Sequence, residues 1–233
     1  MSEFQQLLAP QPLAEPLAEP LAKPLAEPLA VVTPPPDTVY AATLASLNSG
    51  PTPTLLVFDC DYTLYPYDCD KDRIAPFSYV AWSGMHDRHW RPANPYQDVP
   101  AIFGAIADFG ISVAFLSRNP SAEPLENLLR TLPCDSKGEA APKNLWATMP
   151  SSAYFHAYSS DRVGRGKDRH FRTLRAFSGI PFNMMLFFDD LPENIDAAAK
   201  QGTTSVRLGI QGLTLRAFIA GINGWRDAMP RSG

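Results

Sequence analysis

The stretch TPTLLVFDCDYTLYPYDCD, residues 52–70, is the most informative part of this sequence. An apolar run from Leu55 to Phe58 ends in Asp59, and a second carboxylate, Asp61, follows two positions later. A short, unbroken apolar run is typical of a strand buried on both faces. Two like charges at its tip repel each other unless a cation lies between them. The stretch therefore predicts a buried strand that ends in a charged site.

Similar apolar runs recur along the rest of the chain. Apolar runs predict further strands at 111–117, 183–188 and 204–208, and one more within 153–160. Helix-like segments alternate with these strands and carry Asp, Ser or Pro at their starts or Gly at their ends; they span 98–110, 121–132, 167–179, 192–202 and part of 213–225. This alternation predicts an α/β fold with an open, doubly wound, mostly parallel sheet. In such sheets, ligands bind beyond the carboxyl ends of the strands.

The N-terminal region has a different composition. Residues 12–31 repeat the unit Pro-Leu-Ala-Glu/Lys, and a proline at every fourth position forbids a continuous helix. We therefore expect residues 1–50 to be a disordered leader, with a short helix at 38–48, and residues 51–233 to form one domain. The leader is a candidate docking segment for a partner.

Charge and cysteine content exclude several classes of protein. The net charge of −4 comes from residues 1–50, because residues 51–233 contain 19 acidic and 19 basic residues. A domain with this balance has no electrostatic reason to bind nucleic acid or membranes. The first twelve residues lack the pattern of a secretory signal, and no apolar run is long enough to span a bilayer. The three cysteines are irregularly spaced, which favours reduced thiols over disulfides. We therefore expect the protein in the cytoplasm, with the nucleus as the alternative.

The predicted strands share a feature at their carboxyl ends, where polar residues gather. Because these ends meet at one rim of a parallel sheet, we expect the groups to converge; they are Asp59, Asp61 and Thr63, then Ser117 and Arg118, then Lys167, and finally Asp189, Asp190 and Asn194. Mg²⁺ is the natural cation among them, because it takes hard oxygen ligands and bridges to phosphate.

The residue types suggest roles in phosphoryl chemistry. Asp59 beside Mg²⁺ can attack phosphorus and form an aspartyl-phosphate. Asp61, two residues on, can protonate the leaving oxygen and then activate the water that cleaves the intermediate. Ser117 and Lys167 can hold the non-reacting phosphoryl oxygens.

The four motifs in this order resemble those of the haloacid dehalogenase (HAD) superfamily of phosphatases. FDCDYTLYPY, FLSRN, GKDRHF and MMLFFDDLPENI are most similar to its magnesium-dependent phosphatase family, over about residues 53–225. The resemblance implies that Asp59, the backbone carbonyl of Asp61, and Asp190 hold Mg²⁺. It also implies that Thr63, Asp189 and Asn194 support them, and that Ser117, Arg118 and Lys167 contact phosphate or substrate.

The interval between Thr63 and Asp98 leaves room for a small flap but not for a large cap domain. An open site suits a phosphorylated protein side chain, such as phosphotyrosine, or a sugar phosphate. Asp68 stands where an aromatic substrate contact is expected in the family, which leaves the substrate preference open. Two alternatives to hydrolysis remain: a phosphotransferase or mutase on the same fold, and a non-catalytic scaffold that binds a phosphorylated ligand. The intact acid/base Asp61 and the open site favour hydrolysis.

Overall fold

The computed structural model describes residues 35–138, 142–159 and 166–230. The predicted leader lies outside the described residues up to residue 34. The short helix predicted at 38–48 is confirmed as α1 (Pro36–Asn48). Its buried residues Val39, Thr43 and Leu47 recur every four positions and so lie on one face. That face packs against the domain, so the compact unit that contains it, Pro34–Gly233, begins before residue 51.

The predicted parallel sheet is confirmed, with the strand order β5-β4-β1-β6-β7. All neighbouring strands in it are parallel. The strands are β1 (Leu55–Phe58), β4 (Ser112–Ser117), β5 (Phe155–Ala157), β6 (Met185–Asp189) and β7 (Thr204–Arg207). The chain crosses β1 between β5 and β6, so the strand order reverses at β1, which is where α/β sheets place their ligands.

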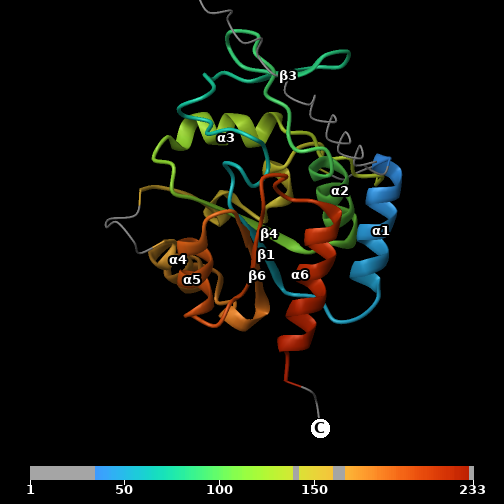
Figure 1. The fold of residues 1–233 in the computed structure, drawn as a ribbon, viewed down its shortest axis with the longest axis vertical. Helices are drawn as coiled ribbons and strands as arrows, with labels where there is room; N and C mark the ends of the chain where they lie inside the picture. Colours follow the sequence, from blue (N-terminus) through green and yellow to red (C-terminus); the bar gives the residue numbers. More distant parts are fainter. Residues whose placement is uncertain (1–34, 139–141, 160–165, 231–233) are drawn as a thin grey trace, which may run out of the picture. The chain divides into compact units, whose positions relative to one another are not determined.

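Helices cover both faces of this sheet (Figure 1). Besides α1, they are α2 (Val99–Phe109), α3 (Ala122–Thr131), α4 (Asp168–Ser178), α5 (Pro192–Ala199) and α6 (Leu215–Ala228). Both α2 and α4 end at a glycine in the left-handed conformation, Gly110 and Gly179, as the sequence predicts. Asp98 precedes α2, but its side chain makes no capping hydrogen bond to this helix. Its carboxylate instead accepts a 2.8 Å hydrogen bond from the backbone N–H of Leu215.

The side chains of the central strands alternate between two apolar layers. Leu56 and Phe58 of β1 face the layer with α1, α2, α3 and α6, whereas Leu55 and Val57 face the layer with α4 and α5. Every residue of β1 and β6 is buried, since both faces are covered. This explains why these strands read as unbroken apolar runs rather than as alternating ones.

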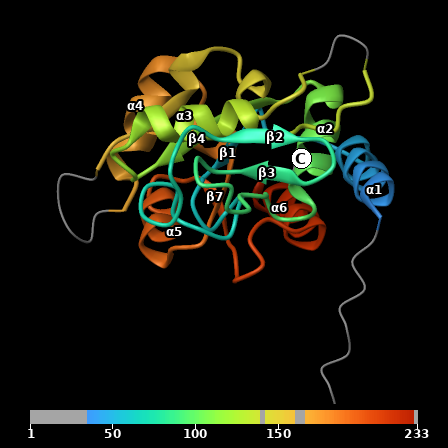
Figure 2. The same ribbon diagram turned by 90° about the horizontal axis from the view of Figure 1, so that it is seen from above.

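A small flap follows β1, as predicted. It is a two-stranded antiparallel hairpin of β2 (Ser78–Val80) and β3 (Gly84–His86). Viewed from above, the hairpin crosses in front of the parallel sheet (Figure 2). No helix lies between residues 64 and 97, all of which are described, so this interval contains no helical cap domain.

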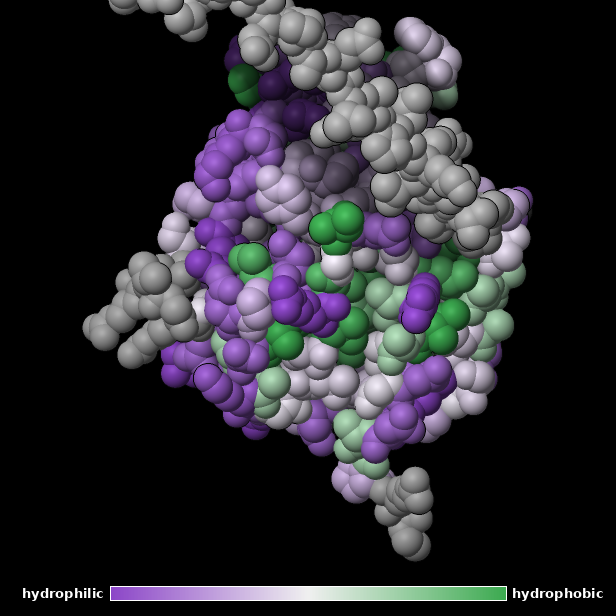
Figure 3. Space-filling view, viewed as in Figure 1, coloured by the Kyte–Doolittle hydropathy of each residue, from purple (hydrophilic) through white to green (hydrophobic). Residues whose placement is uncertain are grey.

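On the face viewed in Figure 3, hydrophobic patches over α6 and α1 are interrupted by polar side chains. Within the described ranges, none of the helices combines the length and apolar character that crossing a membrane requires.

Candidate active site

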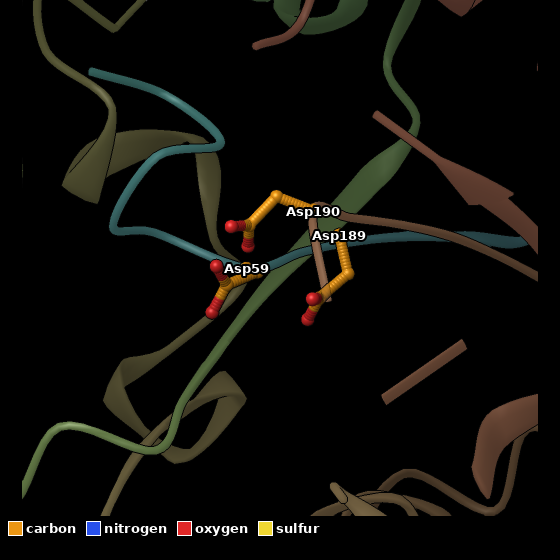
Figure 4. Close-up of side chains that lie close together, drawn as sticks. All are labelled: Asp59, Asp189 and Asp190. Carbon is orange, nitrogen blue, oxygen red and sulfur yellow. The ribbon is translucent and has the colours of Figure 1, made fainter. Parts of the chain in front are cut away.

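The ends of β1 and β6 bring three carboxylates together (Figure 4). Asp59 directly follows β1, Asp189 is the last residue of β6, and Asp190 comes next. Each offers a carboxylate oxygen, and these three oxygens lie within 4.8 Å of one another. The two strands pair in parallel, so their carboxyl ends lie side by side. The predicted convergence at this rim of the sheet is therefore present.

Lys167 supplies the cation behind these carboxylates. It precedes α4, its side chain is 0% exposed, and its Nζ contacts Asp59 Oδ1 and donates to Asp189 Oδ2 at 2.6 Å. Burial alone would lower the pKa of Lys167, but the charges of Asp189 and Asp59 outweigh it and raise that pKa to about 12. Lys167 is therefore a permanent positive charge at the base of the site.

Further hydrogen bonds fix the orientation of two carboxylates. Asn194 Nδ2 donates to both oxygens of Asp189, at 3.0 and 2.9 Å, and the backbone N–H of Leu191 donates to Asp189 Oδ1 at 2.8 Å. Thr63 Oγ1 donates to Asp59 Oδ2 at 3.2 Å. Thr63 thus contacts Asp59, and Asn194 contacts Asp189; their supporting role stays a prediction.

The charges of this group fit a divalent cation. Asp59, Asp189 and Asp190 carry three negative charges when ionised, against one positive charge on Lys167. Burial and the charge of Asp189 raise the pKa of Asp190 to about 6, so it is largely ionised at neutral pH. Two negative charges remain unmatched among oxygen donors, and Mg²⁺ has this charge and this ligand preference.

Asp61 lies apart from the three carboxylates and has neutral partners. Its Oδ1 accepts from Tyr65 Oη at 2.8 Å and from the backbone of Cys69 at 3.0 Å, and its Oδ2 accepts from Asn119 Nδ2 at 3.2 Å. Burial raises the pKa of Asp61, and these hydrogen bonds partly oppose the shift. Cys60, between the two aspartates, is fully buried in the core.

A cavity of about 620 Å³ opens in front of these groups. We call it the active-site pocket. Asp59, Asp61 and Asp190 line it together with Ser117, Arg118 and Asn194. Ser117 is the last residue of β4 and its Oγ accepts a 3.0 Å hydrogen bond from the backbone of Asn119, while Arg118 forms a 3.0 Å ion pair with Glu193. Lys167, Thr63 and Asp189 are buried beneath the pocket.

The sequence prediction assigned no place in the site to Asn119 or Tyr65. Asn119 Oδ1 accepts a 2.9 Å hydrogen bond from the backbone of Ser121, the residue before α3. Its amide nitrogen, however, also contacts Asp61. Its position two residues after Ser117 was a usable signal, because that places it at the same strand end. Nothing in the local sequence indicated the contact between Tyr65 and Asp61.

Comparisons with known proteins give a consistent result. A model of the family described as Acid Phosphatase matches residues 51–228. The chain is 27% identical to magnesium-dependent phosphatase 1 of Homo sapiens, over 76% of this chain and 89% of that protein. It is 24% identical to a HAD-like hydrolase superfamily protein of Schizosaccharomyces pombe, over 72% and 92%. A solved phosphatase-containing fragment from Bacteroides fragilis, complexed with Mg, aligns with a TM-score of 0.48 and 16% identity over 78% of this chain and 44% of that one.

Proposed function

The chain belongs to the acid phosphatase family, and from this membership and the site geometry we propose that it is a Mg²⁺-dependent phosphatase that forms an aspartyl-phosphate. The relatives named above as a phosphatase and as a hydrolase support the reaction class. The main observation behind the proposal is that Asp59, Asp189 and Asp190 lie together at the base of an open pocket. The buried ammonium group of Lys167 contacts two of them, Asp59 and Asp189.

Asp59, Asp190 and the backbone carbonyl of Asp61 are the groups that would hold Mg²⁺. When bound, the ion supplies positive charge that neutralises the phosphoryl oxygens. Asp189 holds Lys167 in place through their 2.6 Å ion pair. Burial raises the pKa of Asp59 well above its ordinary value, and the ammonium group of Lys167, which lies against this carboxylate, partly opposes that shift.

Asp59 is the proposed nucleophile. Thr63 and Lys167 each bind one of its carboxylate oxygens and thereby fix the side chain for attack on phosphorus. The new bond joins an Asp59 oxygen to phosphorus, and the bond from phosphorus to the leaving oxygen breaks with its electron pair. Ser117 and Arg118 line the same pocket, which supports their proposed role of holding the remaining phosphoryl oxygens.

Asp61 is the proposed general acid and base. Its Oδ1 already accepts two hydrogen bonds, whereas among the described residues Oδ2 accepts only from Asn119, so Oδ2 is the oxygen that can carry a proton. The raised pKa of Asp61 favours its protonated form, which donates to the leaving oxygen. The resulting carboxylate then takes a proton from the water that cleaves the aspartyl-phosphate.

The proposed substrates are phosphate monoesters that enter from solvent, either a phosphorylated protein side chain such as phosphotyrosine or a sugar phosphate. The small flap and the open pocket support this range. The three cysteines are buried and unpaired, which supports a reducing compartment, and we propose the cytoplasm.

The test is phosphate release from p-nitrophenyl phosphate, with Mg²⁺ or with a chelator. We expect Mg²⁺-dependent release, no measurable turnover in Asp59→Asn, and a loss of about 10²- to 10⁴-fold in Asp61→Asn. Asp227→Asn serves as the matched control, because Asp227 is exposed on α6 and does not line the active-site pocket. Activity that survives in Asp59→Asn would overturn the aspartyl-phosphate route. Tight phosphate binding without turnover in the wild type would favour a scaffold instead.

A further inference from the structure

A second cavity, of about 450 Å³, lies next to the active-site pocket. We call it the β7 pocket, because Arg207 at the end of β7 and the residues after it form one wall; its lining includes Tyr62, Tyr96, Asp190, Arg207, Leu208 and Ile210. Tyr62 and Asp190 line both cavities. A ligand with its phosphate at Asp190 can therefore extend past Tyr62 into the β7 pocket. None of the roles assigned above uses this space.

Hydrogen bonds hold the wall of the β7 pocket in place. The backbone N–H of Leu208 donates to the carbonyl of Asp189 at 2.8 Å, so the end of β7 is fixed beside the carboxylates. Tyr96 Oη donates to the carbonyl of Ile210 at 3.1 Å. This hydrogen bond joins the loop after β7 to the segment between the flap and α2. Seen from above, β7 lies between α5 and α6 (Figure 2), and both helices contact it. The pocket is thus bounded by hydrogen-bonded segments.

Tyr62 is the aromatic side chain that lines both cavities. Its backbone is in the left-handed region (φ 56°), and its hydroxyl donates to Asp72 Oδ2 at 3.0 Å. The side chain is 44% exposed, and Ile210 across the β7 pocket is 97% exposed. Both present apolar surface to solvent next to a polar site. A flat or apolar segment of a ligand would cover these surfaces.

Charge distinguishes the β7 pocket from the outer part of the active-site pocket. There, Asp68 and Asp70 line the wall, Lys71 is paired with Asp68 at 2.8 Å, and Arg118 is paired with Glu193. In contrast, across the described part of the chain, the guanidinium of Arg207 has neither an ion pair nor a hydrogen bond. With Asp190 engaged by the Mg²⁺ proposed above, an anionic group on a substrate is repelled by the carboxylates of the outer active-site pocket and attracted by Arg207 in the β7 pocket.

Resting on the phosphatase activity proposed above, we infer that the β7 pocket binds a second anionic group of the substrate. The ligand class is a phosphate monoester that carries a carboxylate or another phosphate beyond a short aromatic or apolar segment. One phosphate lies at Asp59 and Asp190, the segment lies against Tyr62 and Ile210, and Arg207 pairs with the second anion. Arginine suits this role because its planar group binds carboxylate or phosphate through two parallel hydrogen bonds.

The test compares three substrates in the full-length chain: 4-carboxyphenyl phosphate, 4-carbamoylphenyl phosphate as its neutral isostere, and 1,4-phenylene bisphosphate. The quantity measured is the ratio of kcat/KM for each anionic substrate to that for the carbamoyl compound. Comparing this ratio between variants cancels the intrinsic reactivity of each leaving group. We expect Arg207→Gln to lower the ratio on the order of five- to tenfold for at least one anion. Whichever substrate loses more identifies the preferred anion.

Arg216→Gln is the matched control, since Arg216 is also exposed and near the C-terminal end of the chain but lines neither cavity. We expect it to leave both ratios unchanged. Ratios that are unaffected by Arg207→Gln, or lowered equally by both substitutions, would overturn the inference.

A binding measurement separates failure of this inference from failure of the proposed function. If the wild type hydrolyses none of the three substrates, the phosphatase proposal is wrong as stated. Calorimetric titration with 4-carboxybenzylphosphonate and its carbamoyl analogue, in Mg²⁺, then measures binding of the second anion without any need for turnover. Tighter binding of the carboxylate that Arg207→Gln removes supports the second-anion site, and equal binding of the two analogues overturns it.

Discussion

Replacing Lys167 with Met should lower the free energy of unfolding by about 3–5 kcal/mol in the absence of divalent cations. The Lys167 ammonium is 0% exposed, touches Asp59, and lies 2.6 Å from Asp189 Oδ2. Methionine has a similar length, so the substitution removes the charge and leaves little empty space. Two buried carboxylates then face each other without the cation between them.

The magnitude follows from two opposing effects. At an effective dielectric constant of about 20, unit charges 2.6 Å apart attract by roughly 6 kcal/mol, so the Lys167–Asp189 pair alone accounts for a large effect. Removing the ammonium also removes the cost of burying it, which offsets part of that attraction. The net loss should grow with pH, because burial raises the pKa of Asp59 well above its ordinary value in the folded state and the opposing charge of Lys167 is then gone. The loss of stability is therefore smallest below about pH 4, the pKa of an aspartate in the unfolded chain, and increases as the pH rises.

Urea unfolding followed by tryptophan fluorescence measures this loss, with EDTA present and at two pH values, about 5 and 8. Trp225 is 1% exposed and donates to the carbonyl of Asn183 at 2.8 Å, so it reports on the folded core. The control is Lys200→Met, because Lys200 is exposed at the end of α5; it should stay within about 0.5 kcal/mol of the wild type.

A double-mutant cycle tests whether the destabilisation comes from the unpaired carboxylate of Asp189. Lys167→Met combined with Asp189→Asn should be less destabilised than the sum of the two single variants, by about 0.5–3 kcal/mol, because the second change removes the uncompensated charge. The reasoning fails if Lys167→Met lies within 1 kcal/mol of the wild type. It also fails if the two effects add without any coupling.

Two further predictions concern the rest of the fold. Burial, together with the charge of Lys167, lowers the pKa of His170 to about 4, so its contribution to stability is complete above its unfolded pKa of about 6.5 and is lost as the pH falls toward 4. His170→Gln should therefore reduce the acid destabilisation in that window by up to about 3 kcal/mol, and urea midpoints that shift with pH as in the wild type would contradict this. Gly104→Ala in α2 should destabilise by about 1–3 kcal/mol, since the added Cβ would lie 2.3 Å from the carbonyl oxygen of Asp135. Gly224→Ala in α6, where nothing lies within 4 Å, should stabilise by about 0.5–1 kcal/mol, and thermal melts in which the two variants behave alike would refute this contrast.

The strands and helices could be predicted because their signals are local. Unbroken apolar runs indicated β1 and β6, and both strands are buried on both faces. Glycines indicated where α2 and α4 end. The candidate site could be predicted because parallel strands carry their carboxyl ends to one rim of a sheet, so residues such as Asp59 and Asp190, far apart in the chain, had to meet there.

Contacts between segments that are distant in the chain could not be predicted in this way. The carboxylate of Asp98 was expected to cap α2 and instead binds the backbone of Leu215, 117 positions away. Asn119 was given no place in the site, and its amide group donates to Asp61, 58 positions earlier.

The sequence by itself determined the alternation of strands and helices, the order of the charged strand ends and hence the chemistry of the site, because each is encoded by residue types at short spacing. Only the tertiary structure decided that Lys167 is fully buried between Asp59 and Asp189. It alone placed Arg207, which has no ion pair or hydrogen bond among the described residues, in a second cavity that Asp190 also lines. The physical reason is that burial and ion pairing depend on how separate segments pack in space, and no local pattern of residues carries that information.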